Sequence, residues 1–331
     1  MAGMDRRKFL KSVFLGAGGV LAGTAGIKAL RGDFRIYTHP LGLADTLPEM
    51  QEEMKLILLG TGMPMPCIYR SKPAQVILAG RKVFLVDCGA GVVTRLVEAG
   101  IAPERIENVF ITHNHSDHTS GFENVFISSW NSGRSMPLSV YGPGNTKDII
   151  GKLMAHLNWD ISLRIAQAKN SPEGAKIHYG EMEEGLICEE EGVKVTVFPV
   201  DHGIVKPAVG YKFEYKGKVI VISGDTQPCE NMVRYSEKAD VLVHEAYSKR
   251  WLDKGLKRFP EKRAMVEGIM EYHSSTLEAA EIAQRAKVKH LVFTHLIPGP
   301  APVWYFEKDW AKGVSDVYKG KVTVGRDLMV L

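Results

Sequence analysis

The sequence predicts an α/β fold in four layers, an αββα sandwich with two β-sheets face to face and helices on both outer faces. Three observations support this architecture. Short apolar runs bounded by glycine recur from residue 54 onward, which is typical of buried strands. These strands first follow one another and then alternate with helical patterns. Hydrophobic residues make up 45% of the 331 residues, enough for a large core.

The elements follow in chain order, each predicted from its periodicity and from the residues that end it. Strands are predicted at 55–60, 74–80, 82–89, 108–113, 193–203, 208–215, 218–225, 239–246, 289–295 and 321–331. Helices are predicted at 92–101, where Gly100 is a stop signal, at 145–158, at 276–286 and near 305–318. No short-period repeat or low-complexity tract interrupts residues 54–331, so this part is predicted to be one domain.

Residues 1–27 have the pattern of an export signal. Arg6 and Arg7 precede an apolar, uncharged stretch of about 15 residues, which is short for a membrane span. The arginine pair is similar to twin-arginine signals, which predicts the twin-arginine export machinery as a partner and a periplasmic or extracellular location. A plain N-terminal membrane anchor is the alternative. Residues 28–53 are predicted to be a linker or N-terminal extension.

Charge and cysteine content argue against two kinds of site. The net charge is +4, but the first eleven residues hold +3 of it, so the remainder is close to neutral, which opposes a nucleic-acid partner. The four cysteines form no C-x-x-C pair and therefore predict no structural zinc site. Free thiols are favoured over disulfides, which stay an alternative if the protein is exported.

The stretch from His113 to His118, with the letters HNHSDH, places four strong metal ligands directly after a predicted strand. His113 and His115 are two positions apart, so both can point the same way while the chain is extended. Asp117 and His118 come after the turn and can face a second ion. This density of ligands at a strand end predicts a metal site.

Two metal ions would need further ligands from distant parts of the chain. Three other predicted strands end in such residues, namely His202, Asp225 and His295. Each follows an apolar run, so all three can converge on one sheet edge with the 113–118 segment. A histidine at a strand end can also be a packed core residue, but the combination predicts one centre.

Together these motifs resemble the metallo-β-lactamase superfamily over residues 54–331 and imply a sandwich of that type. The resemblance implies one zinc held by His113, His115 and His202, a second held by Asp117, His118 and His295, and Asp225 as a bridge. Imidazole and carboxylate ligands without thiolate suit two Zn²⁺ per chain, with manganese or iron as open alternatives.

Other stretches resemble the ribonuclease Z branch and its exported arylsulfatase-like relatives: LLGTGMPMP with Arg70, LVDCGAG, HEAY and YHSSTLEAAEIAQRA. That branch implies a second catalytic pair, here Glu245 and His273, because a histidine oriented by a carboxylate can protonate a leaving oxygen. Two departures oppose tRNA processing. The segment from His202 to Asp225 has no room for the long basic arm of the common bacterial enzymes, and Tyr247 replaces their threonine.

The expected function is an exported dinuclear metal-dependent hydrolase of sulfate or phosphate esters, arylsulfatase-like, with a small-molecule ester as substrate. A metal-bound hydroxide would attack, Asp117 would orient or deprotonate that water, and His273, held by Glu245, would protonate the leaving oxygen. Three alternatives stay open: a lactone or cyclic-ester hydrolase, a ribonuclease Z-type endonuclease and a non-catalytic metal-binding protein. A homodimer also stays open, since dimers are common in the branch.

Overall fold

The computed structural model describes residues 51–331. The predicted export signal, residues 1–27, and the predicted linker up to residue 50 lie outside the described residues. Strand β1 begins at Gln51, three residues before the predicted start of the domain, and the division of the chain stays a prediction. Within the described part, no helix has both the length and the apolar character needed to cross a membrane. All four cysteines are free thiols.

The first sheet has seven strands in the order β14-β1-β2-β3-β4-β5-β6. Their bounds are β1 (Gln51–Gly60), β2 (Ala74–Gly80), β3 (Lys82–Val86), β4 (Asn108–Phe110), β5 (Leu138–Tyr141), β6 (Ile177–Tyr179) and β14 (Met329–Val330). The strands from β14 to β3 pair antiparallel, and those from β3 to β6 pair parallel. The carboxyl ends of β3 to β6 therefore share one edge.

The second sheet also has seven strands, in the order β13-β12-β11-β10-β9-β8-β7. Their bounds are β7 (Gly185–Glu190), β8 (Val193–Val200), β9 (Ala208–Tyr215), β10 (Lys218–Ile222), β11 (Val241–Tyr247), β12 (His290–Ile297) and β13 (Lys321–Val324). Pairing is antiparallel from β7 to β10 and parallel from β10 to β13. The carboxyl ends of β10, β11 and β12 therefore lie together.

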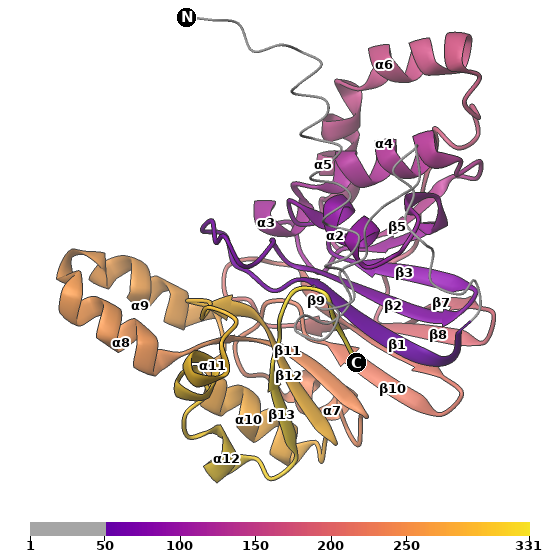
Figure 1. The fold of residues 1–331 in the computed structure, drawn as a ribbon. Helices are drawn as coiled ribbons and strands as arrows, with labels where there is room; N and C mark the ends of the chain where they lie inside the picture. Colours follow the sequence, from indigo (N-terminus) through magenta and orange to yellow (C-terminus); the bar gives the residue numbers. More distant parts are fainter. Residues whose placement is uncertain (1–50) are drawn as a thin grey trace, which may run out of the picture. The chain divides into compact units, whose positions relative to one another are not determined.

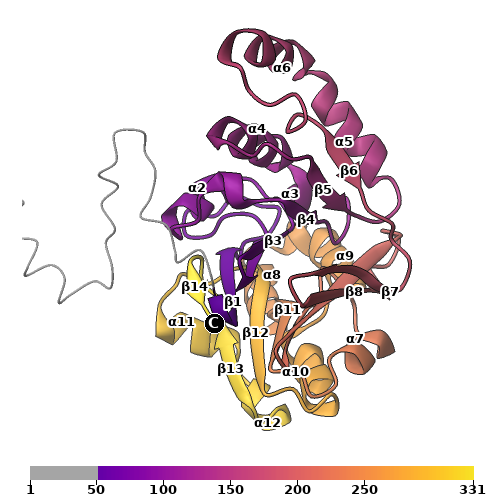
Figure 2. The same cartoon turned by 90° about the vertical axis from the view of Figure 1, so that its right-hand side faces the viewer.

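Helices cover the outer faces of both sheets. Their bounds are α2 (Val92–Glu98), α3 (Ser116–Thr119), α4 (Phe122–Ser132), α5 (Thr146–Ala155), α6 (Asn158–Leu163), α7 (Glu230–Tyr235), α8 (Lys249–Arg258), α9 (Arg263–Tyr272), α10 (Thr276–Arg285), α11 (Trp304–Trp310) and α12 (Val314–Val317), with short turns η1 (Pro103–Arg105), η2 (Arg164–Ala168) and η3 (Pro260–Lys262). Figures 1 and 2 show α2 and α4 on one side of the strands and α10 and α12 on the other. The predicted four-layer αββα sandwich is confirmed.

Strand β1 shows why its sequence reads as a continuous apolar run. Successive side chains of a strand point to opposite faces, and both faces of this sheet are covered. Met54, Leu56 and Leu58 are buried in the core between the two sheets. Ile57 and Leu59 are buried on the other face, in the core beneath α2 and α4.

The end of the chain differs from the prediction. The helix predicted near 305–318 is two helices, α11 and α12, separated by Gly313, whose φ of 94° is in the left-handed region that ends helices. The single strand predicted at 321–331 is also two, and they belong to different sheets. β13 pairs with β12 in the second sheet, and β14 pairs with β1 in the first.

The segment between β11 and α10 forms a pair of helices, α8 and α9, joined by η3. Figure 1 shows the pair projecting away from the two sheets. An apolar seam stabilises it, since Leu252 and Val266 are buried in a small cluster with Tyr247 and Ile297 from the ends of β11 and β12. The sequence analysis assigned no element to residues 247–275, so this pair was missed.

Candidate metal centre

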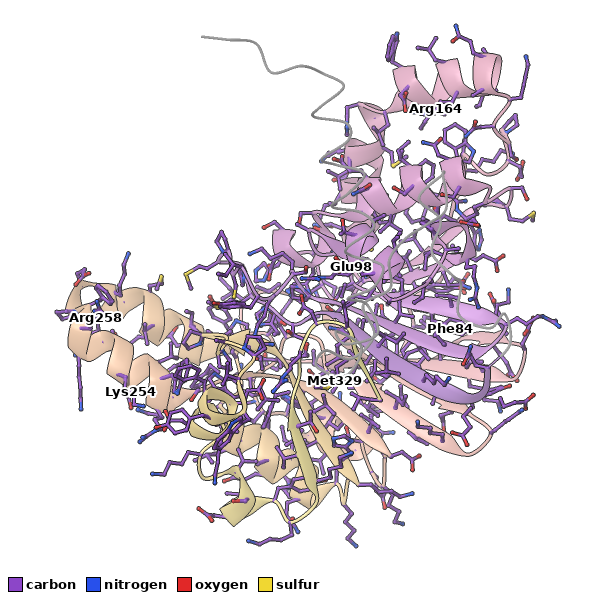
Figure 3. All side chains as sticks on the ribbon, viewed as in Figure 1. Phe84, Glu98, Arg164, Lys254, Arg258 and Met329 are labelled. Atoms are coloured by element: carbon purple, nitrogen blue, oxygen red, sulfur yellow. The ribbon has the colours of Figure 1, made fainter. Side chains whose placement is uncertain are left out.

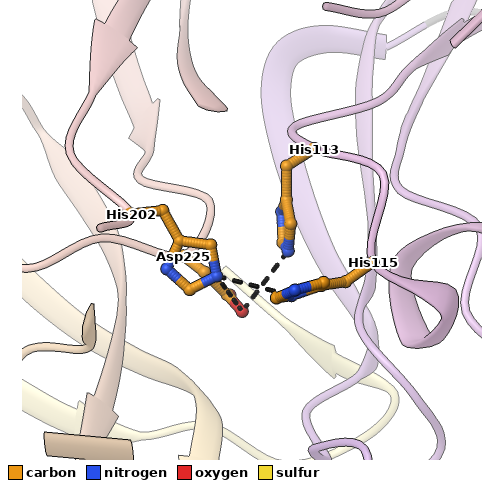
Figure 4. Close-up of side chains that lie close together, drawn as sticks. All are labelled: His113, His115, His202 and Asp225. Atoms are coloured by element: carbon orange, nitrogen blue, oxygen red, sulfur yellow. Dashed lines mark hydrogen bonds and ion pairs between the residues drawn. The ribbon is translucent and has the colours of Figure 1, made fainter. Parts of the chain in front are cut away.

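The structure brings all seven predicted ligands together at one edge of the sandwich. They follow or lie within strands whose carboxyl ends meet there: His113 and His115 after β4, Asp117 and His118 in α3, His202 after β8, Asp225 after β10 and His295 in β12. Figure 4 shows His113 and His115 approaching His202 and Asp225 from the opposite half of the fold. The centre is thus assembled from both sheets.

The seven residues form two adjoining groups. In one, the ligand atoms of His113, His115, His202 and Asp225 all lie within 4.8 Å of one another, and in the other Asp117, His118 and His295 do so. Asp225 Oδ2 lies 3.3 Å from His118 Nε2 and 3.2 Å from His295 Nε2, and 3.7 Å from His113 Nε2. The Asp225 carboxylate therefore lies between the two groups.

His295 reaches the centre through a β-bulge. In the ladder between β11 and β12, Glu245 pairs with Thr294 and Ala246 pairs with Leu296, so His295 is an extra residue without a partner across the ladder. Its φ is 43°, a left-handed conformation that side chains other than glycine rarely adopt. Such a bulge redirects a side chain, and strained residues of this kind concentrate at functional sites.

Asp87, which follows β3, orients two residues of the 112–118 segment. One of its oxygens accepts a hydrogen bond from the Thr112 backbone N–H at 2.8 Å, and the other accepts from His118 Nδ1 at 2.8 Å. His118 Nε2 is thereby left facing the centre. Asp87 was predicted only as part of the LVDCGAG motif, although an aspartate directly after a strand signals this role.

Burial and neighbouring charges keep His113, His202 and Asp225 in the form that binds metal. Burial lowers the pKa of His113 well below its usual value and that of His202 to about 4, so both imidazoles are neutral at pH 7 with a free lone pair. Burial alone would raise the pKa of Asp225, but the imidazoles of His295 and His118 hold it well below its usual value. The carboxylate is therefore charged.

Several polar atoms at the centre fit a bound cation. His113 Nε2, His118 Nε2 and Asp225 Oδ1 are buried and have no hydrogen-bond partner among the described residues. A buried polar atom without a partner costs free energy, whereas a metal ion would satisfy all three. The set of imidazole nitrogens and carboxylate oxygens is one that zinc accepts.

His273 lies in the short link between α9 and α10. Before it, the Tyr272 carbonyl accepts a hydrogen bond from His202 Nδ1 at 2.8 Å, which fixes the ring of His202. After it, Ser275 and Glu278 form a reciprocal capping box that starts α10. The position of His273 is therefore set from both sides.

Glu245 and His273 form the predicted pair. Glu245 Oε1 accepts hydrogen bonds from His273 Nδ1 at 2.9 Å and from the backbone N–H groups of Thr226 and Ser274, each at 3.1 Å. Burial, helped by the charge of Asp225, raises the pKa of Glu245 well above its usual value, and burial lowers that of His273. Burial therefore favours the neutral form of each group, and the pair lies close to Asp225 and His295.

The aromatic residues Trp130, Trp304 and Tyr305 differ in environment. Trp130 in α4 is buried, and its indole N–H donates to the Ser171 carbonyl, so it is a core residue. Trp304 and Tyr305, at the start of α11, are 68% and 62% exposed.

We expect Asp87→Asn to weaken metal binding about 10- to 100-fold, the usual cost of losing a group that orients a metal ligand. The amide N–H would face His118 Nδ1, so the proton of the ring would move to Nε2 and block the ligand atom. Competition with a chromogenic chelator measures the affinity. Asp148→Asn, on the exposed side of α5, is the matched control. Unchanged affinity in Asp87→Asn would show that this carboxylate has no orienting role.

Comparison with known proteins identifies relatives of the whole domain. The family profile described as "Anti-Pycsar protein Apyc1" matches residues 54–257. Ribonuclease Z of Mycobacterium sp. (strain KMS) is 35% identical over 277 residues, which cover 83% of this chain and 94% of the relative. Ribonuclease Z of Mycobacterium bovis (strain BCG / Pasteur 1173P2) is 34% identical over 278 residues, covering 83% of this chain and 96% of the relative.

Solved structures share the fold. The metallo-β-lactamase fold protein YhfI from Bacillus subtilis has a TM-score of 0.63 at 18% identity, covering 84% of this chain and 98% of its own. Human tRNase Z, short form, has a TM-score of 0.59 at 24% identity, with coverage of 84% and 98%. Zn²⁺-bound PqqB from Methylobacterium extorquens has a TM-score of 0.58 at 15% identity, with coverage of 84% and 99%.

One prediction is wrong. The sequence analysis excluded nucleic acid as a partner, but relatives at 35% identity over most of the chain are ribonucleases. The error came from averaging charge over the chain. Residues 249–263, in the projecting helix pair, contain seven Lys or Arg and only two Asp or Glu, so positive charge is concentrated there. A near-neutral total therefore conceals a basic surface.

Proposed function

Since the chain belongs to the ribonuclease Z family of the metallo-β-lactamase superfamily, we propose that it hydrolyses phosphodiester bonds at a centre for two metal ions, with RNA as its substrate class. Membership of the ribonuclease Z family confirms two predictions, the superfamily and an enzyme that hydrolyses ester bonds. The arylsulfatase-like preference, the lactonase alternative and export of the chain stay predictions.

The observation that carries the proposal is the Glu245–His273 pair beside the ligand cluster. Hydrolysis of an RNA phosphodiester expels a ribose alkoxide, a poor leaving group that needs a proton in the transition state. His273 is 6% exposed, is held by a buried carboxylate and lies with Asp225 and His295 at the centre. An aryl sulfate or an activated ester would have less need of such a pair.

The ligands have defined roles in this proposal. His113, His115 and His202 would hold one ion, Asp117, His118 and His295 the other, and Asp225 both. Bound there, two divalent ions such as zinc would supply Lewis acidity and lower the pKa of water. Asp117, whose pKa the His295 hydrogen bond lowers against the effect of burial, is an anionic acceptor for the proton of the attacking water.

The Glu245–His273 pair supplies the proton for the leaving group. Glu245 keeps the Nδ1 proton of His273 in place, so that Nε2 carries the proton that goes to the departing oxygen. Loss of that proton to the leaving group leaves His273 neutral, the form that burial favours. The backbone N–H groups of Thr226 and Ser274 fix the carboxylate while the proton moves.

A substrate panel tests the proposal. On zinc-loaded full-length protein, we expect kcat/KM for bis(p-nitrophenyl) phosphate to exceed that for p-nitrophenyl sulfate and for a γ-lactone by about 100-fold or more, and we expect cleavage of a single-stranded RNA. All products are measured directly, by absorbance or by gel. Faster turnover of the sulfate would restore the arylsulfatase-like assignment, and faster turnover of the lactone would favour the lactonase.

A further inference from the structure

Positive charge is unevenly distributed over the described residues. Residues 249–263 carry a net charge of +5, from seven basic and two acidic residues. The rest of residues 51–331 contains 28 basic and 32 acidic residues, a net charge of −4. Helix α8, with η3 and the first residue of α9, is therefore the basic pole of an otherwise acidic body.

The basic residues of α8 form a stripe. Arg250, Lys254, Lys257 and Arg258 recur at helical spacing and so share one face. Arg250 Nε and Lys254 Nζ donate to Asp309 of α11 at 3.1 and 2.7 Å, so this face lies toward α11. Figure 3 labels two residues of the stripe, Lys254 and Arg258, on the projecting pair.

Three cations near the tip of the pair are available to a partner. Lys257, Arg258 and Lys262 are exposed and form no ion pair with any acid of residues 51–331. The opposite side of α8 packs on α9 through Leu252 and Leu256, so the helix is held and the cations stay on its outer surface. Exposed, unpaired cations on a fixed element suit a polyanion.

A groove lies between α8 and α11, which we name the α8–α11 groove. It has a volume of about 400 Å³ and is lined by Arg250, Trp251, Lys254, Tyr305, Phe306 and Asp309. The rings of Trp251 and Phe306 meet edge to face at 6.3 Å, which joins the two helices. Tyr305, which lines the groove, is 62% exposed, and Trp304, whose ring centre lies 6.0 Å from that of Tyr305, is 68% exposed. Aromatic faces next to cations are the combination that binds single-stranded nucleic acid.

The groove is attached to the strands of the metal centre. α8 begins four residues after Glu245, and α11 begins nine residues after His295. Ser248, at the start of α8, donates its backbone N–H to Ile297 in β12 and its hydroxyl to the Trp310 carbonyl, both at 2.8 Å. A strand of nucleic acid held in the groove would thus be fixed relative to the ligands.

We propose that the α8–α11 groove and the cations Lys257, Arg258 and Lys262 dock single-stranded RNA, with phosphates on the cations and bases on Trp304 and Tyr305. This rests on the proposed function, since the groove is attached to the strands of a centre assigned to phosphodiesters. An anionic membrane offers the same charge to the cations, but it has no planar bases for the aromatic faces, so RNA is the better fit.

Binding of a fluorescein-labelled 12-nucleotide single-stranded RNA tests the docking surface. Zinc-loaded full-length protein is used, with His273→Ala in every variant to prevent cleavage, and anisotropy is measured over a range of salt. We expect the triple variant K257E/R258E/K262E to raise Kd about tenfold or more at physiological salt. The slope of log K against log salt should also fall in magnitude by about 2, since each phosphate contact on a single strand contributes about 0.7.

A second variant separates stacking from charge. Trp304→Ala with Tyr305→Ala should raise Kd about fivefold or more and leave the salt slope unchanged, because stacking on an aromatic ring releases no counterion. Both side chains are largely exposed, so the variant keeps the fold, which circular dichroism and the melting temperature verify.

The matched control is K194E/K287E/K321E, which changes the same charge at exposed lysines near the amino ends of β8, β12 and β13, away from the centre. It should bind RNA like the parent. The docking surface is refuted if the Kd of K257E/R258E/K262E for RNA is within twofold of the parent's, or if the control loses as much affinity for RNA. It is also refuted if K257E/R258E/K262E loses affinity for phosphatidylglycerol vesicles but keeps its affinity for RNA. Failure of the parent sequence to hydrolyse bis(p-nitrophenyl) phosphate would instead refute the proposed function, because that small ester does not need the groove.

Discussion

Replacing Asp225 with alanine is expected to remove metal from the centre and to lower kcat/KM on bis(p-nitrophenyl) phosphate at least about 1,000-fold. The Asp225 carboxylate lies within 3.2–3.9 Å of nitrogens on four histidines from both ligand groups. Without it, the imidazoles of His113, His115 and His202 would have no carboxylate in their group, and two dications would repel. Electrostatic stabilisation by such a centre is usually the largest contribution to the rate.

Metal content is the decisive measurement for this variant. Mass spectrometry of dialysed protein should give two zinc ions per parent chain and fewer than one per Asp225→Ala chain. Asp225→Asn, which keeps the shape, should behave alike, and Asp148→Asn should behave like the parent. Two ions retained by Asp225→Ala would exclude the carboxylate as a shared ligand.

His273→Ala should slow the hydrolysis of esters, and the loss of rate should be larger for a poorer leaving group. Hydrolysis of an alkyl phosphodiester, including RNA, should fall about 100- to 10,000-fold, the usual contribution of a general acid. Hydrolysis of bis(p-nitrophenyl) phosphate should fall less than tenfold, because nitrophenolate leaves without a proton. The comparison is made on kcat at saturating substrate and full metal occupancy.

Two further variants distinguish proton donation from packing. Glu245→Gln should reproduce the dependence on leaving group, since an amide cannot hold the Nδ1 proton of His273 as a carboxylate does. His178→Ala, at an exposed histidine of β6, should leave both substrates unchanged. If His273→Ala lowers the rates of alkyl and nitrophenyl ester hydrolysis equally, His273 is not the general acid.

Much of the centre could be predicted because its ligands are marked locally. An apolar strand that ends in His or Asp is visible in a sequence, and the carboxyl ends of parallel strands meet at one edge. His202 and Asp225 follow β8 and β10, which run in the same direction with the antiparallel β9 between them. The Glu245–His273 pair came from the resemblance, and the structure joins the two side chains by a hydrogen bond of 2.9 Å.

Other features depend on pairing across the sheets, which periodicity does not reveal. The bulge that redirects His295 exists only in the register of β11 against β12. The last residues were expected to form one strand, but β13 and β14 belong to different sheets, and Asp327 in the connection accepts hydrogen bonds from Thr61 and Ser71. A ladder partner 270 residues away cannot be read from the segment itself.

The basic surface was missed for a different reason. Total charge was used to exclude a partner, although recognition depends on where charges lie and which are already paired. Lys254 is neutralised by Asp309, whereas Lys257 and Lys262 are not paired. That distinction follows from the packing of α8 against α11.

Seven residues from both sheets are proposed to hold two metal ions. Anomalous scattering at the zinc edge, from crystals of zinc-loaded protein, tests it most directly. We predict two peaks per chain, one among His113, His115 and His202, the other among Asp117, His118 and His295, with Asp225 adjoining both. A single peak, no peak at this edge of the sandwich, or peaks at other residues would contradict the claim.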